Sequence, residues 1–138
     1  MKIFKCCSLD DTKVAAEFFA QFACPGQCYA LYGNLGFGKT TFTQYLIQSL
    51  NPCIKGISSP TFTLVQTYST KICDVFHVDC YRMKSEEEFY ELGLDEAFPS
   101  GITIIEWPEI IERYLPSSVM KIIFSKKNNI LELSCSDV

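Results

Sequence analysis

The stretch "YALYGNLGFGKTTFTQYLIQSL", residues 29–50, passes from a short apolar run through a glycine-rich loop into a segment with helical spacing of its apolar residues. The loop from Gly33 to Thr40 fits the pattern G-x-x-x-x-G-K-[ST] at every fixed position. A strand, a glycine loop and a helix, in this order, build a phosphate-binding loop. The stretch therefore predicts a loop that holds phosphate groups.

Each fixed position of this loop has a chemical purpose. Gly33, Gly36 and Gly38 let the backbone curl so that its N–H groups point at phosphate oxygens, at the positive end of the following helix. Lys39 supplies a positive charge for the β- and γ-phosphates, and the Thr40 hydroxyl is placed to bind Mg²⁺. The chain lacks the Asn-Lys-x-Asp motif typical of guanine recognition. We therefore expect ATP with Mg²⁺.

The rest of the chain predicts alternating helices and strands around this loop. Ser8 is a suitable N-cap for a first helix, and Gly93 is a suitable stop for a helix begun by Ser85. Strands are expected at 28–32, 62–68, 71–79 and 101–107, helices at 8–23, 40–50 and 85–93, and a hairpin at 119–135 that turns at 126–129. This order predicts an α/β fold, with a P-loop NTPase-like sheet and flanking helices in a single compact domain, residues 1–138.

Composition narrows the possible partners. Hydrophobic residues make up 48% of the chain and charged residues 20%, which is typical of a folded globular protein. The formal net charge is −4, so direct binding of nucleic acid is not expected. The chain has eight cysteines, but its first residues lack the apolar segment of a signal peptide. No apolar run reaches the length of a membrane span. We expect reduced thiols, a cytoplasmic location and no membrane partner.

Two acids end predicted strands: Asp79 follows "VFHV" and Glu106 follows "ITII". One could hold the magnesium ion while the other orients the attacking water, although either could also be a solvated turn residue. His77, on the same strand face as Asp79, is more typical of a hydrogen-bonded structural residue than of a catalyst. Trp107 either lies against the adenine or packs in the core, and Arg82 either contacts phosphate or pairs with the acidic segment 86–88.

Several motifs together resemble one family. They are "GNLGFGKTT", "SPTFTLV" at 59–65, "HVDCYR" at 77–82, "ELGLDEAF" at 91–98 and "IEWPE" at 105–109. In this order and spacing, over residues 8–124, the chain is similar to the TsaE family of bacterial P-loop ATPases of threonylcarbamoyladenosine biosynthesis. The resemblance implies Mg-dependent ATP hydrolysis in a complex with the TsaB and TsaD proteins. In that complex TsaD modifies adenosine 37 of tRNA, and hydrolysis resets TsaB and TsaD between turnovers, so this chain would meet tRNA only indirectly.

The resemblance also implies roles for residues at the matching positions. Thr40 and Glu106 would hold Mg²⁺, Asp79 would be the second functional acid, and Thr61 would belong to a switch-like loop that senses the γ-phosphate. As an alternative, Thr61 is a turn hydroxyl after Pro60. The residues expected to contact the nucleotide are Gly33, Asn34, Leu35, Gly36, Phe37, Gly38, Lys39, Thr40, Thr41 and Trp107.

Two positions depart from the family pattern, which has Asp and Ala where this chain has Asn34 and Phe37. The first removes a negative charge near the phosphates and the second adds a bulky ring, so affinity and turnover are expected to differ from those of relatives. Two other functions stay open. One is a small-molecule kinase with "DCYR" at its acceptor site; the short length of the chain argues against this function. The other is a module that assembles a complex with nucleotide but without significant hydrolysis.

Overall fold

The computed structural model describes residues 1–58, 60 and 64–138. Its strands are β1 (Lys2–Cys6), β2 (Cys28–Tyr32), β3 (Val65–Ser69), β4 (Asp74–Asp79), β5 (Ile102–Glu106), β6 (Met120–Lys127) and β7 (Ile130–Cys135). Its helices are α1 (Leu9–Ala20), α2 (Lys39–Leu50), α3 (Glu88–Glu91) and α4 (Leu94–Ser100), with a 3₁₀ segment η1 (Pro108–Tyr114). The alternation gives the expected α/β architecture.

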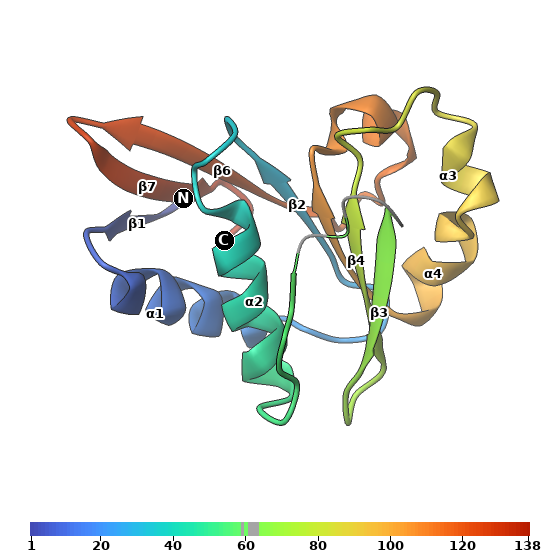
Figure 1. Cartoon of the computed structure of the whole chain (residues 1–138), viewed down its shortest axis with the longest axis horizontal. Coiled ribbons are helices and arrows are strands. Elements are labelled where there is room, and N and C mark those ends of the chain that lie inside the picture. Colours follow the sequence, from blue (N-terminus) through green and yellow to red (C-terminus); the bar gives the residue numbers. More distant parts are fainter. Residues whose placement is uncertain (59, 61–63) are drawn as a thin grey trace.

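All seven strands join one mixed sheet in the order β1-β7-β6-β2-β5-β4-β3 (Figure 1). The centre is parallel: β2 lies between β5 and β6, and β4 pairs with β5. Antiparallel pairs complete the edges: β3 with β4, β6 with β7 and β7 with β1. Strands covered on both faces read as continuous apolar runs, and all five residues of β5, "ITIIE", are buried.

Alternate residues of the central strands face two separate hydrophobic cores. Tyr29 and Leu31 of β2 pack against α1 and α2, in a core that includes Phe19 and Phe42. Cys28 and Ala30 pack into the second core, to which α3, α4 and η1 contribute. Because neighbouring residues of a strand point to opposite faces, helices cover the middle of the sheet from both sides.

The structure confirms most predicted elements. Ser8 caps α1 and accepts a hydrogen bond from the Asp11 N–H at 3.2 Å. The predicted hairpin forms from β6 and β7 and turns through residues 128 and 129, which have φ values of 52° and 63°. Strands β3 and β4 pair antiparallel as a second hairpin. The predicted helix start at Ser85 is wrong. Helix α3 begins at Glu88 without a side-chain cap, and Gly93, with φ of 74°, separates it from α4.

Two elements were not predicted: the edge strand β1 and the segment η1. Strand β1, "KIFKC", is short and pairs with β7 over a sequence separation of more than a hundred residues. A local sequence pattern therefore does not predict this pairing. Segment η1 begins directly after Trp107, whose φ and ψ are both 57°. Within the described residues, none of the helices is long and apolar enough to cross a bilayer.

Candidate functional site

The candidate site lies where β2, β4 and β5 end together. In the parallel register Leu31 pairs with Glu106, and Glu106 pairs with Asp79. The chain leaves β2 one residue after Leu31 and enters the phosphate loop, residues 33–40. Both predicted acids therefore lie beside the root of this loop, at the carboxyl edge of the sheet where α/β proteins bind their ligands.

The phosphate loop has the curled backbone that its glycines predict. Gly36 and Gly38 have φ values of 81° and 84°, in the left-handed region that side chains disfavour. Gly33 has a second reason to be glycine: a Cβ there would lie 2.7 Å from the backbone oxygen of Phe124 on β6. The loop leads directly into α2, whose first backbone N–H groups face the loop and carry the positive end of the helix dipole.

Lys39 begins α2 and sends its side chain into this edge of the sheet, where only 4% of the residue is exposed. Its ammonium donates to the Gly33 carbonyl at 2.5 Å and lies 3.4 Å from the centre of the Trp107 ring. Burial lowers the pKa of Lys39, and the acids Glu106, Glu109 and Asp79 oppose this shift. The two closest partners are neutral groups, so the positive charge is only partly compensated.

Thr40, Glu106 and His77 form a hydrogen-bonded chain below Lys39. The Thr40 hydroxyl donates to the Glu106 carboxylate, at 3.0 Å from Oε1 and 3.3 Å from Oε2. His77 Nε2 lies 2.6 Å from Glu106 Oε2. Glu106 is 3% exposed and His77 is 0% exposed. A carboxylate at this depth needs such partners because burial of an uncompensated charge is costly.

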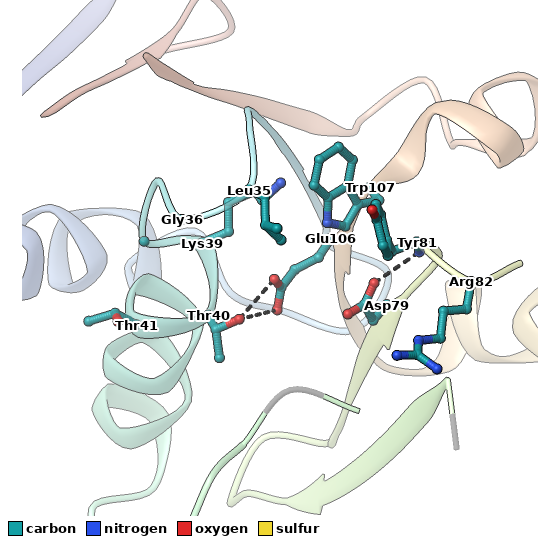
Figure 2. A pocket seen from close by; sticks show the side chains of 11 residues that line it. Leu35, Gly36, Lys39, Thr40, Thr41, Asp79, Tyr81, Arg82, Glu106 and Trp107 are labelled. Atoms are coloured by element: carbon teal, nitrogen blue, oxygen red, sulfur yellow. Dashed lines mark hydrogen bonds between the residues drawn. The ribbon is translucent and has the colours of Figure 1, made fainter. Parts of the chain in front are cut away.

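Asp79 lies next to Glu106 but has a different environment. Its Oδ1 accepts the backbone N–H of Tyr81 at 2.9 Å, and 7% of the residue is exposed. The Tyr81 ring lies 4.9 Å from the Trp107 ring, so these aromatic side chains form one side of the site. Figure 2 shows Asp79 and Glu106 reaching the same space from neighbouring strands.

These residues surround a cleft of about 590 Å³. Nine predicted site residues line it, namely Leu35, Gly36, Gly38, Lys39, Thr40, Thr41, Asp79, Glu106 and Trp107, together with Tyr81 and Arg82. Trp107 lines this cleft and also packs against the second hydrophobic core, so the structure does not choose between its two expected positions. Glu86, an alternative partner for Arg82, pairs with Arg113 at 2.9 Å. Thr61 lies outside the described residues.

Three residues expected at the nucleotide do not line the cleft: Gly33, Asn34 and Phe37. Gly33 packs on β6, as its close approach to Phe124 shows. The Phe37 side chain packs against the core beneath α1 and α2, and the Lys126 ammonium lies 5.0 Å from its ring centre. The bulky ring that departs from the family pattern is therefore directed toward the β6–β7 hairpin rather than into the cleft.

Sequence reasoning missed two contributors. Tyr81 lines the cleft, and its position directly after the predicted strand end in "DCYR" was the available signal. Glu109, in the first turn of η1, lies close enough to Lys39 for their charges to interact; burial raises the Glu109 pKa and the lysine opposes the shift. Glu109 is the last residue of the "IEWPE" motif, but its approach to Lys39 depends on the turn after Trp107, which the sequence does not predict.

Comparison with known proteins covers almost the whole chain. Residues 6–132 match the family model described as "Threonylcarbamoyl adenosine biosynthesis protein TsaE". A "tRNA threonylcarbamoyladenosine biosynthesis protein TsaE" of Rickettsia bellii (strain RML369-C) is 44% identical over 115 residues, which are 83% of this chain and 80% of the relative. The protein of the same name from Bacillus subtilis (strain 168) is 39% identical over 118 residues, which are 85% of this chain and 73% of the relative.

The fold comparison agrees with the sequence comparison. The crystal structure of Bacillus subtilis YdiB superposes with a TM-score of 0.80 and 31% sequence identity, covering 97% of this chain and 83% of that one. Every residue that lines the cleft lies inside the region that matches the family model.

Proposed function

Because this chain belongs to the TsaE family of threonylcarbamoyladenosine biosynthesis proteins, we propose that it binds and hydrolyses ATP for that modification of tRNA. The observation that carries the proposal is the convergence of Lys39, Thr40, Glu106 and Asp79 on one cleft at the end of the parallel strands. These four residues have the chemistry that phosphoryl transfer to water requires: a cation, two oxygen ligands for a metal and a second acid.

The donor set fits a magnesium ion. The Thr40 hydroxyl and the Glu106 carboxylate present oxygens 3.0 Å apart on one wall of the cleft. Mg²⁺ in nucleotide sites takes one or two such protein oxygens and completes its shell with phosphate oxygens and water. The ion would neutralise charge between the β- and γ-phosphates. Thr40 and Glu106 are the residues that would hold it.

The loop fits a triphosphate. In the described part of the chain, no heavy atom lies within 4 Å of the place where a Cβ of Gly36 would be, and Gly36 lines the cleft. Backbone N–H groups of the loop and the first turn of α2 would bind the phosphate oxygens. Lys39 would then exchange the neutral partners Gly33 and Trp107 for phosphate oxygens, which compensate its charge better.

Asp79 is the residue to which we assign the attacking water. It lines the cleft next to the metal-binding pair, and its hydrogen bond to the Tyr81 N–H fixes the direction of the carboxylate. A carboxylate so placed accepts a hydrogen bond from water, orients its oxygen toward the γ-phosphate and accepts its proton as the bond forms. Tyr81 and Trp107 would shield one side of this space from bulk solvent.

We further propose that TsaB and TsaD are the partners that hold the tRNA, and that hydrolysis resets this pair between turnovers. The net charge of −4 supports an indirect role, since a chain with this balance lacks the positive field that grips a nucleic-acid backbone. We also propose a cytoplasmic location, because a role in tRNA modification requires the compartment that holds the tRNA.

The test is the rate of ATP hydrolysis by the purified chain, alone and with a TsaB–TsaD pair, with Asp79→Ala as control. The proposal predicts hydrolysis that the pair accelerates and that Asp79→Ala abolishes. ATP consumption that rises with a nucleoside or sugar and needs no protein would instead indicate a small-molecule kinase. Tight nucleotide and partner binding without hydrolysis, unchanged by Asp79→Ala, would indicate an assembly module.

A further inference from the structure

His77 is a fully buried imidazole that the proposed hydrolysis does not use. It lies on β4 between Val75 and Asp79 on the strand face that looks toward α2, and it pairs in register with Ile104 of β5. Glu106 is two residues further along β5 on that same face. This diagonal relationship brings His77 Nε2 to 2.6 Å from Glu106 Oε2.

The hydrogen-bond pattern assigns the proton of the ring. Nδ1 is buried and has no hydrogen-bond partner in the described part of the chain. Glu106 as a carboxylate accepts hydrogen bonds only, so the hydrogen lies on Nε2 and points at Oε2. Among the described residues, the His77 ring therefore makes its hydrogen bond through Nε2 alone. The purpose of His77 is therefore found in this nitrogen and the carboxylate that it contacts.

This contact selects one arrangement of Glu106. Oε2 is the oxygen nearer to His77, and Oε1 is the oxygen nearer to the Thr40 hydroxyl, at 3.0 Å. Without the histidine donor the carboxylate could rotate about its last bond, or leave the wall of the cleft for better hydrogen bonds. With it, Oε1 stays beside Thr40 Oγ1 before any ion arrives.

We propose that His77 is a positioning residue that holds Glu106 so that Oε1 and Thr40 Oγ1 form a ready pair of magnesium ligands. The inference rests on the proposed function, because it assumes that these two oxygens bind the ion of a magnesium–nucleotide complex. Hydrogen bonds from outside the ligand shell orient metal ligands in this way, and their loss costs about 10- to 100-fold in metal affinity. His77 itself touches neither nucleotide nor metal in this assignment.

Two amide substitutions separate positioning from packing. In His77→Gln the amide nitrogen is three bonds from Cβ, as Nε2 is in histidine, so it can still donate to Glu106. In His77→Asn the same amide is one bond shorter and falls short of the carboxylate. Thr103→Val is the matched control, since Thr103 is also 0% exposed but lies on the opposite face of β5, beside Cys28 in register.

The measurement is the affinity for a non-hydrolysable ATP analogue by isothermal titration calorimetry, in EDTA and across a magnesium titration. Magnesium should enhance the affinity for the analogue, and we expect His77→Asn to raise the magnesium concentration that gives half of this enhancement about tenfold. The affinity for the analogue measured in EDTA should stay within about twofold of wild type. His77→Gln and Thr103→Val should behave as wild type. A thermal melt of each variant confirms that it is folded.

Two results would overturn the inference. One is a wild-type magnesium dependence in folded His77→Asn, and the other is an equal loss in His77→Asn and His77→Gln. If His77→Asn does not fold, the His77→Gln result decides: a tenfold weaker magnesium response there refutes positioning, and a wild-type response supports it. Failure of the wild-type chain to bind the analogue at all would refute the proposed function itself.

Discussion

Asp79 and Glu106 occupy paired positions on neighbouring parallel strands, and both carboxylates enter the same cleft. Their hydrogen-bond partners differ: Glu106 is held by the Thr40 hydroxyl and His77, whereas Asp79 accepts a backbone N–H from Tyr81. Two adjacent acids with like charge repel each other, and a metal ion beside one of them would relieve the repulsion. Under the proposed function, these partners favour Glu106 as the acid that binds the metal and Asp79 as the acid that orients the attacking water.

Exchanging each acid for its amide should separate these two roles. We expect Glu106→Gln to raise the magnesium concentration needed for half-maximal ATP hydrolysis by about tenfold, because a neutral amide is a weaker ligand. Asp79→Asn should instead lower the maximal rate by about 100-fold or more, because the amide cannot accept a proton. Hydrolysis rates across a magnesium titration measure both quantities. If Glu106→Gln mainly lowered the maximal rate and Asp79→Asn mainly raised the magnesium requirement, the two roles would have to be exchanged.

Lys39→Ala should weaken nucleotide binding by about 10- to 100-fold, since it removes a charged hydrogen-bond donor from the base of the phosphate loop. Calorimetric titration with ATP and magnesium provides the affinity. Lys126→Ala is the matched control: its ammonium also contacts the loop, 5.0 Å from the Phe37 ring centre, but on the side away from the cleft. Equal affinities of wild type and Lys39→Ala would contradict the assignment of the loop.

The nucleotide-free protein should become more stable when Lys39 is replaced by methionine. The ammonium is buried against the neutral groups Gly33 and Trp107, and burial lowers its pKa, so the charge opposes folding. Methionine keeps the packing of the stem without the charge. We expect a melting temperature about 2–5 °C higher in the absence of nucleotide, and a smaller further rise with ATP than in wild type. A lower melting temperature would show that the lysine charge is well compensated.

The gain from Lys39→Met should also depend on pH. Below the lowered pKa of folded Lys39, both the folded and unfolded states carry the proton, and the full cost of burying the charge is present. As pH rises from there toward the ordinary value of 10.5, the folded state loses its proton first and the cost disappears. The difference in melting temperature between variant and wild type should therefore shrink as the pH rises toward 10.5. A constant difference would assign the gain to packing.

Two glycines of the phosphate loop should respond differently to alanine. At Gly33 a Cβ would overlap the Phe124 backbone, so Gly33→Ala should cost about 3–5 kcal/mol of unfolding free energy. At Gly36 there is open space but φ is 81°, so Gly36→Ala should cost only about 1–2 kcal/mol. The methyl group at Gly36 would nevertheless point into the space for phosphate and weaken nucleotide binding. Urea unfolding and calorimetry test the two effects; equal unfolding costs would contradict the packing of Gly33.

Local patterns were sufficient for much of the fold. Local patterns predicted α1, β2, α2, β4 and β5, namely the Ser8 cap, the P-loop motif and the apolar strand runs. Each of these patterns depends on neighbouring residues alone. The start at Ser85 failed because η1 contributes to the core around α3, where the stacked rings of Phe89 and Tyr114 hold the helix and no cap is needed. Strand β1 was missed because β7, with which it pairs, is remote in sequence.

Site residues that lie at strand ends or at fixed positions of a motif could be predicted from the sequence. Asp79 and Glu106 were identified as a pair from two separate strands, and the parallel register explains why they meet. The contact of Lys39 with Trp107 was not predictable, since it depends on the left-handed conformation of Trp107 at the start of η1. Nor was the contact from His77 to Glu106, because it requires knowing that β4 and β5 are neighbours.

The strand order has a consequence for how the protein is made. The phosphate loop directly follows β2 in the sequence. Both neighbours of β2 in the sheet, β5 and β6, are synthesised 70 or more residues later. Contacts between such distant segments form slowly because long loops must close first. During translation, the emerging chain therefore carries a complete phosphate-loop sequence long before it has a site. We therefore expect the site to form only late, after β5 and β6 dock on either side of β2.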